Sequence, residues 1–537
     1  MATAEAVPHL NRLSNRLGPK PSSQREQAPE PAIAAARPDG QGQAGLRATV
    51  VRGAGFTSGG YLLTQVITFV SYIAFARLAS PKVFGTLAAG WTIVGVSAFL
   101  VESGMSAALI QRKDRLEEAA ATATVATFVG GIALSLLALG LSPIVGFYFH
   151  SHDVGLVAAA LSGVLLMNAA TVVPDALLRR RFSFLRTSVV DPLSALCYGA
   201  IAVGLLVAGM GVWGLVIATY GAGVVRVGSS WLFVRWIPRL ELVSFSMWRE
   251  LARFGRHIIA SEFLRQVSGI ANALLLGRFL GLAPLGEFRF GWRMATDAAT
   301  PVTSATLYVL FPAFARIADD LDRFRAAFLR SLRLLGFVVL PISFALAPLG
   351  EQIAVAALGP PWRAAGTVLA ALAGVTAGLP LITLGNEVFK SANRPDLVPR
   401  VTLLITVGTV ALIVAFLPFG VAGVAGGLSL AYVVAAAYAL TNVTRVLALP
   451  RSAILAELWG PFVASALMAG GLALFAEYVV DLDGASTLTR LVWLLGEACL
   501  ALLIYATAAF VLARATAREF VLTLRSLVHG SRTRQPV

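Results

Sequence analysis

The chain has 537 residues, of which 57% are hydrophobic and 13% are charged, and its mean hydropathy is +0.77. So little polar sequence excludes a water-soluble globule, because it cannot cover the surface of one. The formal net charge of +15 would suggest nucleic-acid binding in a soluble protein, but the positions of the basic residues explain it as a membrane-orientation signal, so we expect no nucleic-acid partner.

Apolar runs of about 20 residues predict about 14 membrane-spanning helices, because that length crosses the hydrocarbon core of a bilayer. The two cysteines, Cys197 and Cys499, lie inside such runs, so we expect no disulfide framework, no metal site and no cofactor. The predicted fold class is therefore an all-α polytopic membrane protein. In chain order the spans lie near 56–78, 84–108, 119–140, 153–175, 188–208, 211–234, 257–280, 285–312, 328–349, 364–389, 401–419, 421–443, 460–479 and 491–513.

Basic residues concentrate in every second gap between these spans. The even-numbered gaps carry clusters such as 112–115 and 179–186, whereas the odd-numbered gaps hold only Lys82, Arg363 and Arg490. Short basic loops are retained on the cytoplasmic side of a membrane, so the even-numbered gaps and both termini are predicted to be cytoplasmic. The chain is therefore expected to cross its membrane many times.

The predicted spans divide into two lobes and a final pair. We expect a disordered cytoplasmic tail at 1–52, because this segment is rich in Pro, Gln, Ala and Gly and has no apolar core of a signal peptide. Between the lobes, 237–256 mixes Trp and Phe with Arg and is predicted to be an amphipathic linker in the inner headgroup layer. The remaining units are an N-lobe at 53–236 (spans 1–6), a C-lobe at 257–450 (spans 7–12), spans 13 and 14 at 451–513, and a cytoplasmic tail at 514–537.

The two lobes share a weak internal repeat. Shifting the sequence by 201 positions aligns four identical residues within a short stretch, one of them a tryptophan, and a second set recurs at the sixth and twelfth spans. A shift of six spans preserves orientation, so two six-helix bundles related by an axis along the membrane normal are predicted. The aligned pairs are Arg77 with Arg278, Gly85 with Gly286, Gly90 with Gly291 and Trp91 with Trp292, then Gly211, Val212 and Gly214 with Gly420, Val421 and Gly423.

Charged residues inside the spans are the main candidates for a site, because each is costly in hydrocarbon unless it faces a partner or water. Glu262 and Arg265 belong to a polar stripe on the seventh span, and Arg289, Arg293 and Asp297 to one on the eighth. One interpretation is a cationic cavity in which the three arginines bind phosphate oxygens and the two acids limit or gate that charge. The alternative is a set of interhelical ion pairs, with Arg289 extending to the outer interface.

Further charged residues within the spans or near their ends are also candidates for a functional or a structural role. Arg226 on the sixth span either binds an anionic substrate or forms a structural ion pair. Asp175 and Asp191, near the cytoplasmic span ends, are expected to cap helices or pair with arginines. Glu387, near the inner end of the tenth span, is a candidate for binding a coupling proton or sodium ion.

Motifs typical of ATP hydrolysis or catalysis are sparse outside the spans. No P-loop motif is present, so the chain is not expected to hydrolyse ATP by itself. The predicted outer loops are short; their polar residues include Asp481, Asp483 and His152, which we interpret as solvated. A membrane-embedded polymerase or ligase would need catalytic groups in such loops and is the least favoured class.

Several segments together resemble the Wzx-type oligosaccharide flippases and related polysaccharide transport proteins. They occur in order and at similar spacing between about 53 and 450, although each alone is weak. The chain departs from the pattern in its long N-terminal tail and in Phe288, where tyrosine is common. The segments run from Arg77 to Gly85, Glu102 to Gln111, Leu178 to Phe182, Gly277 to Gly281, Leu285 to Phe288 and Leu310 to Ala313, and include Leu358, Gly359 and Trp362.

The resemblance implies a member of the multidrug, oligosaccharidyl-lipid and polysaccharide exporter superfamily, with two six-helix lobes in a V shape and two extra helices. It implies a secondary transporter, not an enzyme, that flips a polyprenyl-pyrophosphate-linked oligosaccharide by alternating access coupled to H⁺ or Na⁺. Implied partners are membrane lipids, a polysaccharide polymerase and glycosyltransferases. Alternatives within the superfamily are a lipid II flippase and a multidrug or metabolite cation antiporter.

Overall fold

The computed structural model describes residues 43–112, 114–180, 184–479, 487–514, 516–520 and 522. Within these ranges, side chains are not described at 43–58, 96, 98–104, 107, 111, 184–187, 254–268, 305–309, 311–312, 478–479 and 487. Every regular element among the described residues is a helix, which confirms the all-α class. The predicted tail at 1–52 lies outside the described residues as far as 42, and α1 already begins at Gln43. Of the predicted tail at 514–537, only 514, 516–520 and 522 are described.

Nine helices in the described ranges are long and apolar enough to cross a membrane, or ten if one bent pair counts as a single span. These helices confirm a polytopic membrane protein, while the total of about 14 spans stays a prediction. Many of their apolar side chains are exposed on the outside of the protein, as expected for surfaces that face lipid.

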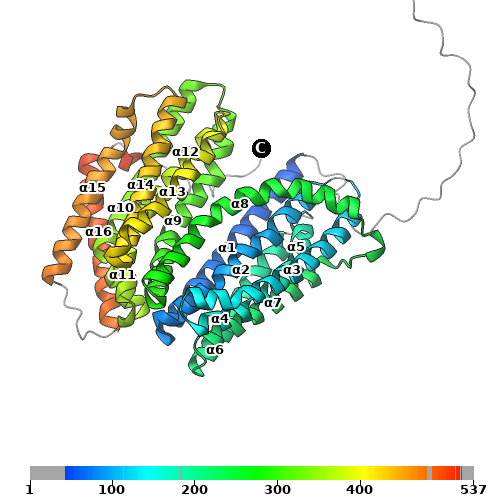
Figure 1. Ribbon diagram of the computed structural model, residues 1–537. Coiled ribbons are helices and arrows are strands. Elements are labelled where there is room, and N and C mark those ends of the chain that lie inside the picture. The colour runs from blue at the N-terminus through cyan, green and yellow to red at the C-terminus, as the bar shows by residue number, and fades with distance from the viewer. Residues whose placement is uncertain are drawn as a thin grey trace, which may run out of the picture.

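The N-lobe consists of seven helices in Figure 1. Helix α6 packs against both α1 and α7, and α5 packs against α2, α3 and α7. Proline and glycine set the boundaries, for example Pro81 in the first turn of α2 and Gly211, with φ of +54°, before α7. The bounds are α1 Gln43–Leu78, α2 Pro81–Gln111, α3 Leu116–Tyr148, α4 His152–Leu161, α5 Val164–Arg180, α6 Phe184–Val207 and α7 Val212–Val234.

The C-lobe repeats this order, and a final helix pair packs beside it (Figure 1). Short 3₁₀ turns connect some of the helices: η1 Leu240–Leu242, η2 Pro360–Trp362 and η3 Leu417–Phe419. The helices of the second repeat are α8 Phe245–Phe279, α9 Leu282–Arg316, α10 Leu321–Leu358, α11 Arg363–Ala371, α12 Ala373–Ser391, α13 Leu397–Phe416 and α14 Gly420–Val446, and the final pair is α15 Arg451–Val479 and α16 Thr487–Leu512. Helix α8 packs against α2 and α3 of the N-lobe as well as against α9 and α13.

Helix ends confirm the internal repeat. Helix α8 ends at Phe279 and α9 begins at Leu282, both at the predicted offset of 201 positions from Leu78 and Pro81. In both lobes the fourth predicted span is divided into two helices, α4 and α5 in one and α11 and α12 in the other. The pair in the C-lobe is bent by 43°, whereas 152–180 forms one continuous candidate span. Because unrelated sequences would not break at equivalent places, the two lobes are copies of one unit.

The segment predicted as a linker, 237–256, is only partly separate from the helices that flank it. Its second half is already part of α8, which runs without interruption from Phe245 to Phe279. The start of α8 is held on the N-lobe, because Arg112 donates two hydrogen bonds of 2.9 and 3.2 Å to the Glu250 carboxylate. That guanidinium holds the pKa of the Glu250 carboxyl below its usual range. The exposed apolar side chains of Ile237 and Phe245 suit the predicted headgroup layer.

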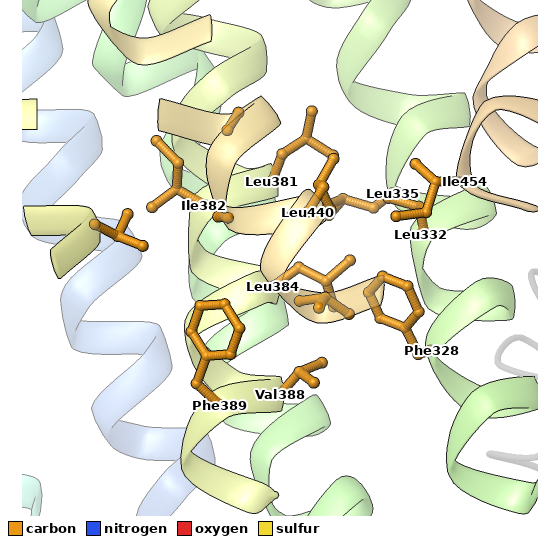
Figure 2. Packing of buried hydrophobic residues seen from close by; sticks show 14 of the residues in the cluster. Phe328, Leu332, Leu335, Leu381, Ile382, Leu384, Val388, Phe389, Leu440 and Ile454 are labelled. Carbon is orange, nitrogen blue, oxygen red and sulfur yellow. The ribbon is translucent and has the colours of Figure 1, made fainter. Parts of the chain in front are cut away.

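A large apolar cluster ties α10, α12 and α14 of the C-lobe to α15. Figure 2 shows side chains of α10, α12, α14 and α15 gathered in one layer. Phe328, Leu384 and Val388 have 0% exposure, and between helices in a membrane such side chains stabilise the fold through close van der Waals packing. The layer makes the C-lobe and the start of α15 one packed unit. Its labelled members are Phe328, Leu332, Leu335, Leu381, Ile382, Leu384, Val388, Phe389, Leu440 and Ile454.

The two lobes meet at one end of the helices and spread apart toward the other, which gives the V shape of Figure 1. We call the meeting point, where Pro81–Gly85 of α2 crosses Leu282–Gly286 of α9, the closed end, and the opposite side the open end. A Cβ on Gly85 would lie 1.6 Å from the Leu282 carbonyl oxygen, and one on Gly286 would lie 2.0 Å from the Pro81 carbonyl oxygen. The crossing therefore requires glycine on both helices, in repeat-related positions.

Two repeat-related arginines reinforce the closed end. The Arg77 Nε donates to the Ala357 carbonyl oxygen at the end of α10, over 3.0 Å. Arg278 donates to the Tyr148 carbonyl oxygen at the end of α3, also over 3.0 Å. Each guanidinium thus satisfies terminal carbonyl groups of a helix in the opposite lobe, where a positive charge also complements the helix dipole.

Trp362 is the largest apolar side chain shared by the two lobes at the closed end. It has 0% exposure, packs against Phe84 and Phe290, and donates from Nε1 to the Ala76 carbonyl oxygen over 2.7 Å. We expect Trp362→Ala to destabilise the protein by about 3–5 kcal/mol, because it leaves a cavity and an unpaired carbonyl. Thermal melting in detergent measures this.

The matched control is Trp459→Ala, because Trp459 is 68% exposed on α15. Its melting temperature should stay close to that of the wild type. Equal melting temperatures for the two variants would contradict the packing assigned to Trp362.

Candidate functional site

The candidate site lies between α9 of the C-lobe and α1 of the N-lobe. Arg289, Arg293 and Asp297 follow one another at four-residue steps on α9, so they share one face of the helix, as predicted. That face is directed at α1, because the Arg293 guanidinium lies 5.2 Å from the centre of the Tyr72 ring. Hence the site is built jointly by the two lobes, a short distance from the closed end.

Arg289 is the cation of this site that has no partner among the described residues. Its side chain is exposed, although protein surrounds the guanidinium closely. No hydrogen bond or ion pair joins it to any other residue in the part of the chain that the structure describes; the phenol of Tyr72 interacts with it through space. An arginine that is accessible to solvent, enclosed by protein and unpaired is suited to bind an anion from solution.

Arg293 is partly neutralised. Its Nε donates to the Asp297 carboxylate over 2.7 Å, within one turn of α9, and the two side chains remain 35% and 26% exposed. The predicted ion pair is therefore formed, and the remaining donors of the guanidinium stay available to a ligand. The Tyr72 ring contributes a cation–π contact on the other side.

A small pocket that opens to solvent lies beside this pair. Its lining combines two charged residues with aromatic and aliphatic side chains from α1, α9 and α10, so a ligand there would meet one polar edge and an apolar wall. The lining residues are Phe69, Tyr72, Ile73, Phe290, Arg293, Met294, Asp297 and Leu358.

The other predicted residues of the stripe are only partly placed. Glu262 and Arg265 lie on α8, but their side chains lie outside the described residues, so their role stays a prediction. Asp481 and Asp483 also lie outside the described residues. His152 begins α4 at the closed end and is exposed.

Arg226 lies apart from the α9 site, inside the N-lobe. It donates to Asp175 of α5 and to Asp191 of α6, each over 3.1 Å. Asp175 also accepts a hydrogen bond of 2.8 Å from Ser230. These contacts form the structural ion pair that the sequence left open as one of two interpretations, and a binding role for Arg226 stays a prediction.

Glu387 lies on α12 toward the open end and is 2% exposed. Lys390 donates to it over 2.8 Å from the next turn of the helix. The side-chain oxygen of the adjacent Asn386 is buried without a hydrogen-bond partner. The ion-coupling role of Glu387 is not tested by this arrangement and stays a prediction.

Tyr72 is a site residue that the sequence interpretation missed, although a signal was present. Tyr61, Gln65, Thr68 and Tyr72 recur at four-, three- and four-residue steps on α1, which is the spacing of a polar helical face. Their moderate polarity drew less attention than the charges on α8 and α9. In the described parts of the chain, no group of three His, Cys, Asp or Glu side chains is arranged to hold a metal ion.

A solved structure defines the class of fold. The chain superimposes on the lipid II flippase MurJ in an inward closed conformation with a TM-score of 0.68 and 11% identity, over 86% of this chain and 99% of that one. Solved transporters of the superfamily that the sequence resembles have the same architecture. The chain is therefore a multi-pass membrane protein with the fold of that exporter superfamily.

The sequence comparisons then give the family. Residues 74–366, more than half of the chain, match the family described as "Polysaccharide biosynthesis protein", and the chain belongs to this family. The "Succinoglycan biosynthesis transport protein ExoT" of Rhizobium meliloti is 29% identical over 337 residues, which cover 60% of this chain and 66% of that protein. The "Lipopolysaccharide biosynthesis protein WzxC" of Escherichia coli is 23% identical, over 64% of this chain and 69% of that protein. The predicted resemblance is thereby confirmed.

Proposed function

We propose that the protein is a flippase that moves a polyprenyl-pyrophosphate-linked oligosaccharide repeat unit across the bacterial inner membrane. The product would feed the synthesis of a surface polysaccharide such as O-antigen, exopolysaccharide or capsule. Family membership and the relatives' names support the transport of a polysaccharide precursor. The observation that carries the proposal is Arg289, an enclosed and unpaired cation between the lobes.

The diphosphate of the lipid carrier is the part of the substrate that suits this cation. Arg289 offers forked donors to phosphate oxygens, and Arg293 lies one turn further along the same face of α9 with donors left over from Asp297. Two guanidinium groups at this spacing can bind adjacent phosphates. The apolar wall of the neighbouring pocket provides surface for the first sugar or the start of the lipid.

The direction of access follows from the charge pattern. The basic even-numbered gaps connect helices at the open end, for example around Arg112, Arg180 and Arg316. If this end is cytoplasmic, as the charge pattern predicts, the described conformation admits substrate from the inside and is closed toward the periplasm. Rocking of the lobes about the site would then separate α2 from α9 and release the headgroup on the other side.

Asp297 is the residue that we propose for ion coupling within this site. It accepts a hydrogen bond from Arg293 in the structure, and a diphosphate would compete for the same guanidinium. The freed carboxylate would then take up a proton or sodium ion. Glu262 and Glu387 remain further candidates for this role.

A cation antiporter fits the site less well, because the unpaired charge at Arg289 repels cationic substrates. Lipid II carries the same diphosphate, so a lipid II flippase differs in the sugar and not in the cation site. The test of function therefore compares two lipid-linked substrates, an oligosaccharide repeat unit and lipid II.

The test uses full-length protein in proteoliposomes that carry either substrate, and it follows the accessibility of the sugar to an enzyme that cannot cross the membrane. We expect flipping of the oligosaccharide lipid and a decrease of about 10- to 100-fold in Arg289→Ala, because a charged hydrogen bond of about 1.5–3 kcal/mol is lost. Arg289→Lys should retain part of the activity, since it keeps the charge without the fork.

The matched control is Arg323→Ala. Arg323 lies at the open end, its side chain is 79% exposed, and it pairs only with Asp320 one turn away among the described residues. Its flipping rate should match the wild type. Wild-type flipping by Arg289→Ala would reject the site, and flipping of lipid II alone would assign the other substrate.

A further inference from the structure

A second buried carboxyl group lies far from the α9 site, on the last helix of the final pair. Glu497 occupies the central part of α16, within the candidate span Leu488–Leu512. It is 0% exposed, and neither of its carboxyl oxygens has a hydrogen-bond partner. Glu497 takes part in no ion pair with another described residue, so its charge, if present, would be uncompensated.

Gln352 of α10 supplies the polar group beside Glu497. Its side-chain amide is close enough to interact with the carboxyl, although the contact does not have the geometry of a formed hydrogen bond. The Gln352 side-chain oxygen is itself buried without a partner. Glu497 and Gln352 are thus neighbours on α16 and α10, and each has a buried oxygen atom without a hydrogen-bond partner among the described residues.

The charged groups on the packed elements leave this pair isolated. On α15 no charged residue occurs between Glu457 and Glu477, and the residues that pack here are apolar, such as Met468 and Leu472. On α10, the neighbouring Glu351 pairs with Arg363 over 2.9 Å. On α16 itself, the next charge is Arg490, two helical turns toward the start of the helix.

Binding of one proton by Glu497 would give both unsatisfied groups a hydrogen-bond partner. A bare carboxylate in a dry apolar site costs many times more than a neutral carboxylic acid, so such a group is neutral when it lacks a partner. The neutral acid gains an O–H donor, and the neighbouring Gln352 side chain carries an acceptor oxygen that still lacks a donor, which rotation of its amide group would bring to the carboxyl. We propose that Glu497 is a proton-binding site of the final helix pair, with Gln352 as the acceptor of the bound proton.

A proton bound at Glu497 would lie apart from the Arg293–Asp297 ion pair. Loss of the proton would leave an unpaired charge between α10 and α16, which is relieved only if water enters between these helices. Protonation therefore holds α16 against the C-lobe. Its use as a coupling site rests on the proposed flippase function, whereas the proton site itself does not.

The test is labelling with dicyclohexylcarbodiimide, an apolar reagent that adds to protonated carboxyl groups within a membrane. Full-length protein in liposomes is treated at neutral pH, and labelled peptides are identified by mass spectrometry. We expect labelling at Glu497 and its loss in Glu497→Gln. Glu457, which pairs with Arg333 over 3.6 Å, and the exposed Glu477 are internal controls that should remain unlabelled.

Infrared spectroscopy provides a second measurement that does not depend on reagent access. The carbonyl stretch of a protonated carboxylic acid should be present in the wild type and absent in Glu497→Gln. Gln352→Leu should shift that band to higher frequency, because the acceptor of the hydrogen bond is removed. A purely structural role of Gln352 would not move the band.

Two results would overturn the proposal. One is an ionised Glu497, seen as absence of both the label and the carbonyl band. The other is protection from labelling by added sodium ions, which would make Na⁺ the ligand. Both measurements are made without substrate, so failure of the flippase function would appear separately, as absence of flipping in the wild type.

Discussion

Gly85→Ala is expected to abolish the closed end and, with it, transport. The added Cβ would lie 1.6 Å from the Leu282 carbonyl oxygen, which is backbone and cannot rotate away. Helices α2 and α9 must therefore separate, and overpacking of this kind costs about 1–3 kcal/mol or more. We expect a lower melting temperature in detergent and flipping at background level in proteoliposomes, because one of the two alternating states is lost.

Gly95→Ala is the matched control on the same helix. A Cβ at Gly95 would meet no atom within 4 Å, so this variant should be unchanged or more stable by up to about 1 kcal/mol. Gly286→Ala should reproduce the defect, because its Cβ would lie 2.0 Å from the Pro81 carbonyl oxygen. The double variant should cost less than the sum, since both changes separate the same two helices. Wild-type flipping by Gly85→Ala would show that the helices do not approach this closely.

Arg293→Glu is expected to abolish flipping while the protein still inserts in the membrane. The change removes a guanidinium next to Arg289 and places a second carboxylate one turn from Asp297. The like charges destabilise the helix by only a few tenths of a kcal/mol, so the fold should survive. The diphosphate, however, would meet a negative site. Flipping in proteoliposomes is measured together with the elution of the purified variant in gel filtration.

A charge swap separates binding from ion pairing. Arg293→Asp combined with Asp297→Arg keeps one acid and one base at the same spacing, but moves the guanidinium one turn away from Tyr72 and Arg289. If Arg293 binds substrate, the swapped protein should remain inactive. Restored flipping would assign Arg293 to the ion pair alone, the alternative that the sequence left open.

The site could be predicted in part. The four-residue spacing of Arg289, Arg293 and Asp297 determined that they share a helix face, because helical periodicity is local. Their partner across the lobes, Tyr72, is more than 200 positions away in the chain, and no local rule joins it to them. Glu497 is similar: a carboxyl group in a span is visible in the sequence, but its dry contact with Gln352 depends on how α16 packs against α10.

The internal repeat could likewise be predicted only in part. Gly85 and Gly286 align in the sequence, and this predicted two related lobes. Gly85 contacts α9 and Gly286 contacts α2 only once the two lobes have assembled. The hydrogen bonds from Arg77 and Arg278 to carbonyl groups of the opposite lobe also depend on this assembly. The sequence also predicted an unbroken tenth span, because apolar length alone does not reveal a bend between two helices.

What the sequence determined by itself is the all-α membrane class, the parallel repeat, the family and the polar face of α9, because hydropathy, periodicity and charge are properties of neighbouring residues. What only the tertiary structure decided is which charges are paired and which are free to bind. Arg226 lies between two aspartates, Arg293 is half neutralised, and Arg289 has no partner among the described residues. These differences arise from helices far apart in the chain, whose packing sets the distance between charges and therefore the energy of each pair.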